Sequence, residues 1–226
     1  MDTNTRDDNS NTNYAIDTAT IEEMINEINL DEISFLRLEI IENEDNLSEE
    51  KTSEEDKTDE NSNEEKSLTS SSPNISEFKY IIRDIANHPE VLKLKNYEQH
   101  AHKSTYFHCT HVSFITYIIC KKLNLDYVSA TRAAMIHDLY YYDWHANEPG
   151  HRLHGFTHPK VALNNAQELF ELNEKEKDII LKHMWPLTLS LPKYKESYVV
   201  TLVDKYCTSH EVISNIKVKI KSLFKK

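Results

Sequence analysis

Histidine is the residue type that stands out in this sequence, with twelve copies in 226 residues. One of them forms the pair His137-Asp138 at the end of an apolar stretch, where a helix would normally give way to solvated side chains. A borderline divalent metal accepts nitrogen and oxygen donors together, and this pair would supply both from one rigid turn. Taken alone, the pair could instead be a helix end at which the histidine is hydrogen-bonded and neither residue binds a metal.

Four further residues strengthen the metal-site interpretation. His108 lies near the start of the preceding predicted helix, and His158 and His183 lie at the ends of the two helices predicted to follow the pair. Asp204 lies inside an apolar stretch of the last long helix, and carboxylates are almost never buried unless they are paired or bound to a metal. A salt bridge to Lys205 or to another base is the alternative for Asp204.

The elements that must position these residues can be predicted from apolar spacing and from capping residues. Asp126, Thr157 and Asn173 are the expected N-caps, with Pro159 in the first turn of the helix that Thr157 opens. No segment shows sustained strand alternation with turn signals, so the fold class is predicted to be all-α. The predicted helices cover about 76–87, 104–123, 126–136, 157–169, 173–185 and 197–213, followed by a basic C-terminal helix.

The order of these residues resembles the HD-domain superfamily of metal-dependent phosphohydrolases. Within it, the chain looks like a branch of small prokaryotic HD proteins, and the resemblance covers residues 96–212. It implies a helical bundle with its metal site between helices from different parts of the chain. The stretches that carry the resemblance are His137-Asp138, Tyr142 to His145, Leu153 to Pro159, Lys182 to Leu187 and Leu202 to Cys207.

The resemblance also implies a ligand set. In the family, the histidine of the first helix, the HD pair and the distal aspartate bind one metal. Members with two metals add histidines from the two helices between, and the HD aspartate bridges. One or two divalent ions (Mn, Fe, Zn, Mg or Ni) are therefore the expected cofactors. The positions that match the ligands are His108, His137, Asp138, His158, His183 and Asp204.

The implied activity is hydrolysis of a phosphomonoester or phosphodiester, of a nucleotide or a similar small molecule, by a metal-activated water. Asp138, His154 and Lys205 are the expected catalytic residues. The expected substrate contacts are His100, which could reach a phosphate oxygen, Trp144, which could stack on a base, and His154. A non-catalytic HD module that binds a nucleotide or a protein partner is the alternative. Oxygenation, which some relatives with two iron atoms perform, also stays open.

Charge divides the chain into two parts. Residues 1–76 hold 22 acidic and 5 basic residues, a net charge of −17, whereas residues 77–226 hold 16 and 21, a net charge of +5. A segment this charged cannot bury enough apolar surface to offset the entropy of ordering it. We therefore expect a largely disordered acidic tail over 1–75 and one domain over 76–226. A short amphipathic helix over 20–41 would either dock on a partner or on the domain, or form only transiently.

Composition excludes several classes of protein. Two glycines are too few for a glycine-rich phosphate loop or a dinucleotide-binding fold. No apolar run approaches the ~20 residues of a membrane span, and the polar N-terminus is unlike a signal peptide.

Three separated cysteines predict no disulfide framework, so a cytoplasmic protein is expected. The acidic tail disfavours nucleic acid, while the mildly basic domain suits a small anionic substrate. The oligomeric state stays open.

Overall fold

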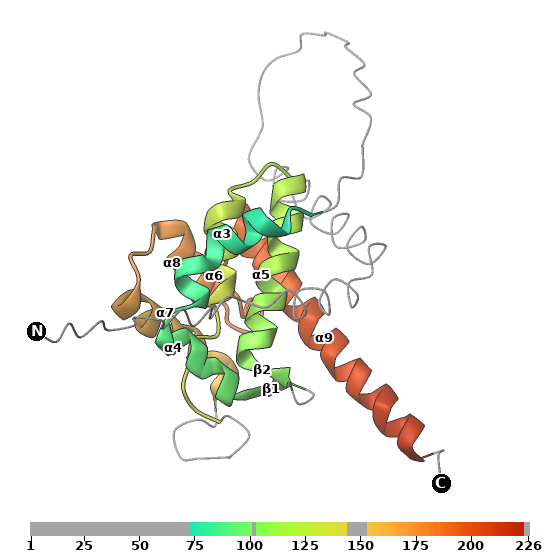
Figure 1. Cartoon of the computed structure of the whole chain (residues 1–226). Coiled ribbons are helices and arrows are strands. Elements are labelled where there is room, and N and C mark those ends of the chain that lie inside the picture. Colours follow the sequence, from blue (N-terminus) through green and yellow to red (C-terminus); the bar gives the residue numbers. More distant parts are fainter. Residues whose placement is uncertain (1–72, 101–102, 144–152, 224–226) are drawn as a thin grey trace, which may run out of the picture.

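The computed structural model describes residues 73–100, 103–143 and 153–223, which are mostly helical (Figure 1). The acidic stretch 1–72, including the segment 20–41, lies outside the described residues. None of the described helices is both long and apolar enough to cross a membrane. The elements are α3 (Ile75–Ala86), α4 (Pro89–Leu92), the 3₁₀ helix η1 (Lys93–Asn96), β1 (Glu98–His100), β2 (Lys103–Ser104), α5 (Thr105–Lys122), α6 (Tyr127–Met135), α7 (His154–Leu169), α8 (Glu174–Lys182) and α9 (Lys195–Leu223).

Local capping explains where three of the central helices begin. Ser104 caps α5, and the predicted N-caps of α6 and α8 are confirmed. The Asp126 side chain accepts a hydrogen bond from the Ser129 backbone N–H at 3.1 Å. Asn173 and Glu176 form a capping box, in which each side chain accepts from the backbone N–H of the other. Such caps each contribute about 1 kcal/mol, and they fix the direction in which each helix leaves its loop.

The start of α7 differs from the prediction. The helix begins at His154, three residues before the expected cap Thr157, so Thr157 lies inside it. Its extra turn is closed by the Leu153 carbonyl oxygen, which accepts from both the backbone N–H and the hydroxyl of Thr157. Gly155 packs so closely on Leu187 that an added Cβ would lie 3.0 Å from a methyl carbon of that side chain. A tertiary contact therefore holds a turn that local signals do not predict.

The C-terminal region forms one helix rather than the two that the sequence patterns predict. Helix α9 runs without interruption from Lys195 to Leu223, a length of about 44 Å at the usual rise per residue. No glycine or proline occurs between these residues, so nothing interrupts the ladder of backbone hydrogen bonds. In Figure 1 the C-terminal half of α9 extends beyond the other helices.

A short antiparallel hairpin that the sequence patterns did not predict precedes α5 in this mostly helical fold. Glu98 pairs with Ser104, and His100 pairs with Lys103. Strands of three and two residues are too short for an alternating pattern to show in a sequence. The hairpin matters because it buries the side chain of Gln99 against the centre of the domain.

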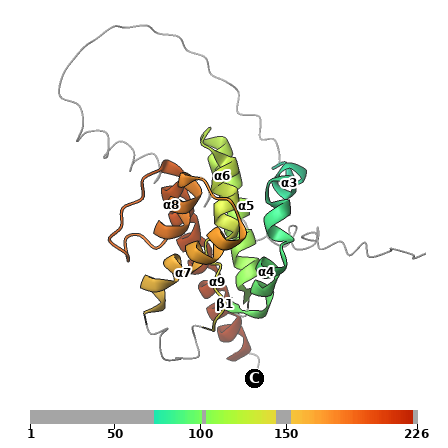
Figure 2. The same ribbon diagram turned by 90° about the vertical axis from the view of Figure 1, so that its left-hand side faces the viewer.

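Helix α5 occupies the middle of the bundle. It packs against α6 and α9, and Figure 2 shows α7 and α8 on one side of it with α3 and α4 on the other. Side chains on nearly every face of this helix are buried, which is why its sequence shows little amphipathic patterning. The apolar core around it includes Phe78, Phe114, Ile179 and Val203. Each such side chain contributes roughly 1.5–3 kcal/mol by burial, which makes the core a rigid support for polar groups.

Candidate metal centre

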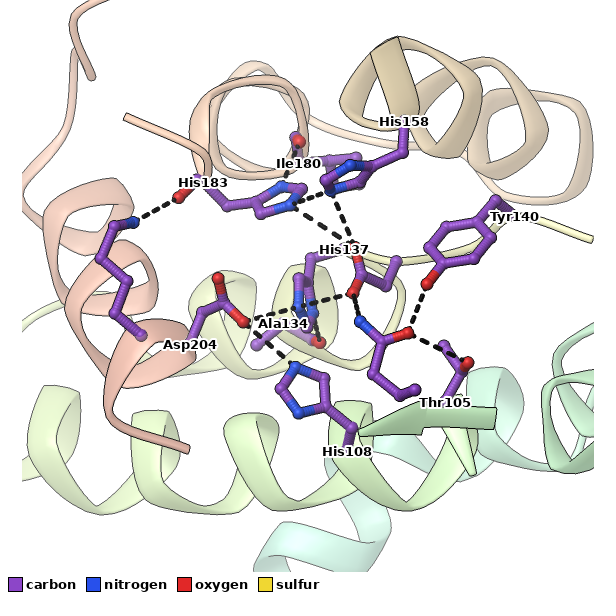
Figure 3. A network of polar contacts seen from close by, with 12 residues as sticks. Thr105, His108, Ala134, His137, Tyr140, His158, Ile180, His183 and Asp204 are labelled. Carbon is purple, nitrogen blue, oxygen red and sulfur yellow. Dashed lines mark hydrogen bonds and ion pairs between the residues drawn. The ribbon is translucent and has the colours of Figure 1, made fainter. Parts of the chain in front are cut away.

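The structure brings the six predicted ligands together in one buried cluster (Figure 3). None of the six is more than 7% exposed. Three groups of three residues among them place one ligand atom each within 4.8 Å of one another. Because the residues come from five helices or helix ends, only tertiary packing can assemble them. They are His108 on α5, His137 and Asp138 in the turn after α6, His158 on α7, His183 at the C-cap of α8 and Asp204 on α9.

One side of the cluster, here called the carboxylate half, consists of His108, His137, Asp204 and Glu211. Asp204 Oδ1 lies 3.1 Å from His108 Nε2 and 3.6 Å from His137 Nε2. On the other side of the His108 ring, Nδ1 lies 3.2 Å from Glu211 Oε1. The sequence patterns did not single out Glu211. An acid seven residues after Asp204, two turns along the same helix face, is the signal that could have found it.

The opposite side, here called the imidazole half, consists of His158 and His183. His158 Nε2 lies 3.1 Å from Asp138 Oδ1, and His183 Nε2 lies 3.5 Å from the same oxygen. The two Nε2 atoms are 2.7 Å apart. Three donor atoms from three different elements therefore lie close enough together to share one cation.

Asp138 lies between the two halves. Its Oδ1 faces the imidazole half, while Oδ2 lies 3.7 Å from His137 Nε2 and accepts a hydrogen bond of 2.7 Å from Gln99 Nε2. Gln99 is itself fixed, because its Oε1 accepts from the hydroxyls of Tyr140 and Thr105. This supporting chain was missed in the sequence, since a single buried glutamine on a short strand gives no periodic signal.

Three of the four histidine rings are oriented by their own helices. In each, Nδ1 lies within hydrogen-bond distance of a main-chain carbonyl oxygen three or four residues earlier, as Figure 3 shows for His137 and His183. A carbonyl oxygen only accepts, so Nδ1 carries a proton and each ring directs Nε2 toward the centre. The three bonds are His137 to Ala134 at 2.7 Å, His158 to His154 at 2.8 Å and His183 to Ile180 at 2.8 Å.

Charge in the carboxylate half shifts its pKa values strongly. Burial disfavours the charged form of His108, but Glu211 and Asp204 outweigh burial and raise the pKa of this imidazole well above its usual value. The pKa of Asp204 is correspondingly held well below its usual range by His108 and His137, against the opposing effect of burial. With these side chains alone, the carboxylate half is a network of ion pairs.

The imidazole half behaves differently. Burial lowers the pKa of His183, and the neighbouring imidazoles lower it further. The pKa of Asp138 is lowered well below its usual value, because His137 and His158 outweigh the effect of burial on its carboxyl group. Asp138 is therefore an anionic oxygen donor beside a neutral nitrogen donor, His183.

The cluster has the donor set and the spacing for a metal ion. His137 Nε2 and Asp138 Oδ1 are buried without a hydrogen-bond partner in the described part of the chain, which costs roughly 1–3 kcal/mol for each group. A bound cation would satisfy both. Two nitrogen ligands of one metal lie about 3 Å apart, close to the 2.7 Å between the Nε2 atoms of His158 and His183. Imidazole and carboxylate together suit a borderline divalent metal.

A cavity of about 400 Å³ adjoins the cluster and is lined by Asp138, Asp204 and the imidazole half. Lys205 and His154, two of the expected catalytic residues, line the same cavity. The Lys205 ammonium donates to the carbonyl oxygens of His183 at 3.1 Å and Thr201 at 3.3 Å, and burial lowers its pKa. The structure thus pairs Asp204 with histidines rather than with Lys205, its neighbour in sequence.

The expected substrate contacts are placed unequally. His154 lies half-buried at the cavity, with Nδ1 3.0 Å from the Tyr142 hydroxyl oxygen. Trp144 lies outside the described residues, and for His100 the structure describes the backbone in β1 but not the side chain. Met184 and Leu187 form an apolar part of the cavity wall.

Neither a protein-family model, nor a curated protein, nor a solved structure matches this chain. The structure itself establishes a mostly helical fold and a buried group of histidines and aspartates that could hold a metal ion. The interpretation of the centre therefore rests on its geometry and on the order of its motifs in the sequence.

Proposed function

We propose that the protein is a metal-dependent phosphohydrolase with an HD-type centre. The observation that carries the proposal is the position of Asp138, which lies between two sets of nitrogen and oxygen donors at the wall of a cavity. The resemblance of the motif order to the HD superfamily supports the same reaction class. A structural site for a single metal ion would not need a carboxylate shared between two ligand sets.

Two divalent ions would share Asp138. His108, His137 and Asp204 would complete the ligands of one ion, and the imidazole half would complete those of the other. When bound, such ions lower the pKa of a water molecule and neutralise charge on a phosphate group. Gln99 would orient the Asp138 carboxylate, because its hydrogen bond to Oδ2 holds one oxygen toward each of the two ligand sets.

The remaining residues at the cavity suit the binding and protonation of a phosphate ester. Lys205 is held beside the centre by two carbonyl oxygens, and an ammonium group has a third N–H with which to bind a phosphate oxygen. Burial raises the pKa of Tyr142 to about 12, so its hydroxyl keeps its proton and donates to His154 Nδ1. This bond would leave the His154 proton on Nε2, from which it would protonate the leaving-group oxygen.

The proposed substrate is a small phosphorylated molecule, such as a nucleotide. A cavity of about 400 Å³ lies in the usual size range for small-molecule sites. Met184 and Leu187 would contact the uncharged part of such a molecule, while Lys205 and the metal centre would bind its phosphate.

A substrate screen of the purified full chain tests the proposal. Metal content is measured first, and nucleotides and aryl phosphates are then assayed with manganese, magnesium, iron, zinc or nickel, beside the Asp138→Ala variant. Turnover that requires metal and disappears in the variant supports a phosphohydrolase. Tight nucleotide binding without turnover under any metal would instead assign a binding module, and oxygen consumption by the iron-loaded protein would assign an oxygenase.

A further inference from the structure

Glu211 is a buried carboxylate that the proposed reaction does not yet use. Its side chain is fully buried between α9 and α5, and its Oε1 lies 3.2 Å from His108 Nδ1. Its second oxygen, Oε2, has no hydrogen-bond partner in the described part of the chain. His111, one turn after His108 on α5, is also buried, and neither of its ring nitrogens forms a hydrogen bond among the described residues. His108 is thus the group to which Glu211 is bound.

Stability alone does not account for such a residue. Removing a carboxylate from water is expensive, and one hydrogen bond recovers only part of the cost. Buried ion pairs can often be replaced by apolar residues of similar size with no loss of stability. A buried acid whose one hydrogen-bond partner among the described residues is a predicted metal ligand therefore indicates a task that an apolar side chain could not perform.

His108 differs from the other three rings in what orients it. His137, His158 and His183 each use a carbonyl oxygen of their own helix or helix end, whereas His108 uses a side chain from another helix. Asp204 and Glu211 lie two turns apart on α9, so they contact the two nitrogens of the same ring from opposite sides. Rotation of the ring about its axis would break both contacts.

We propose that Glu211 is a positioning residue for His108 as a metal ligand. Its carboxylate accepts a hydrogen bond from the Nδ1–H group of His108, which fixes the ring with Nε2 toward Asp204 and the centre. The same hydrogen bond makes Nε2 a stronger donor, as in the carboxylate–histidine–metal arrangements of other metalloproteins. The inference rests on the proposed metal centre and adds to it a residue outside the six ligands.

Calorimetric titration of the full chain with Mn²⁺ tests the role of Glu211. Glu211→Gln keeps the shape of the side chain and removes its charge, so we expect the tighter of the binding steps to weaken about 10–100-fold. Glu196→Gln is the matched control, because Glu196 is a buried acid on the same helix that instead binds Lys175 at 2.8 Å. The control should keep wild-type affinity for Mn²⁺.

Two further measurements separate positioning from folding. Thermal unfolding in chelator should show that Glu211→Gln stays folded, because its amide oxygen can still accept the hydrogen bond from His108 Nδ1. In a His108→Ala background, Glu211→Gln should cause no further loss of affinity, because its effect passes through that ring.

The possible results are distinct. If wild type binds Mn²⁺ and Glu211→Gln binds it equally tightly, the positioning role is wrong and the metal centre stands. The same conclusion follows if the effects of His108→Ala and Glu211→Gln are additive. If wild type binds no divalent metal, both the positioning role and the proposed function are overturned.

Discussion

The two halves of the centre are built by different physical means. In the imidazole half, each ring is held by a hydrogen bond to a carbonyl oxygen within one helical turn. In the carboxylate half, His108 is held between Asp204 and Glu211, which lie about a hundred residues further along the chain. The orientation of each ring in the imidazole half is therefore set as soon as its helix forms, whereas that of His108 is set only when α5 and α9 pack together.

The difference extends to charge. In the carboxylate half, Glu211 and Asp204 raise the pKa of His108, and Asp138 raises that of His137, whereas burial lowers the pKa of His183 in the imidazole half. Strong anionic charge attracts a cation, but protons compete for the same nitrogens. We therefore expect the carboxylate half to bind metal more tightly and with a stronger dependence on pH, and the imidazole half to bind metal more weakly beside the cavity.

Asp138→Ala is expected to have the largest effect, because this residue serves both halves. The variant should lose metal from both positions and lose at least 1,000-fold in turnover, in line with removal of a group on which the whole centre depends. Metal analysis after gel filtration and a steady-state assay measure the two losses. Asp178→Asn is the matched control, since Asp178 is a buried acid that binds Lys182 and Ser197 and belongs neither to the cluster nor to the cavity wall. A variant with full metal content would refute the bridging role of Asp138.

Substitutions confined to one half should separate the two binding steps. Asp204→Asn should weaken the tighter step by more than the ~10–100-fold typical of outer partners, because it removes a ligand rather than a support. His183→Ala should instead weaken the second step and leave the first near its wild-type affinity. Calorimetry of the two variants side by side makes the comparison. Equal loss of both steps in each variant would show that the halves bind as one unit.

The pH dependence of metal binding should differ between the halves. Because their pKa values are raised, His108 and His137 hold protons near neutral pH, and metal binding must release them. Affinity in the carboxylate half should therefore fall as the pH is lowered and rise until the pH passes these raised pKa values. His183, with its lowered pKa, should bind metal without releasing a proton. Calorimetric titration with metal in buffers with different heats of ionisation measures the number of protons released in each binding step. Proton release confined to the weaker step would contradict the assignment of the protonated histidines to the carboxylate half.

Tyr142→Phe is expected to have the smallest effect, because it touches neither ligand set. Loss of the hydroxyl removes the hydrogen bond to His154 Nδ1. Such a bond is worth about 0.5–1.5 kcal/mol, so turnover should fall roughly 2- to 10-fold. Metal content should be unchanged, and the fall should be smaller for substrates whose leaving groups need no proton, such as nitrophenyl phosphate. An equal fall for all substrates would argue against proton donation by His154.

Much of the fold follows from local signals. The caps Asp126 and Asn173 and the helical spacing of the apolar residues place α6 within one residue of both its observed bounds and α8 within one residue of its start, although α8 ends three residues before the predicted 185. The first turn of α7 and the hairpin around Gln99 could not be predicted, because tertiary contacts hold them. The continuity of α9 was also missed, although the absence of glycine and proline from its sequence is a local signal.

The sequence by itself determined which residue types stand at which helix ends, and hence that histidines and aspartates in this order point to a metal site. Only the tertiary structure decided how they meet. The order of residues along the chain does not specify that Asp138 turns one oxygen to each half, or that Glu211 faces the back of the His108 ring. Those contacts depend on the rotation of α9 about its axis and on its crossing with α5, which are fixed by the packing of apolar side chains in the shared core.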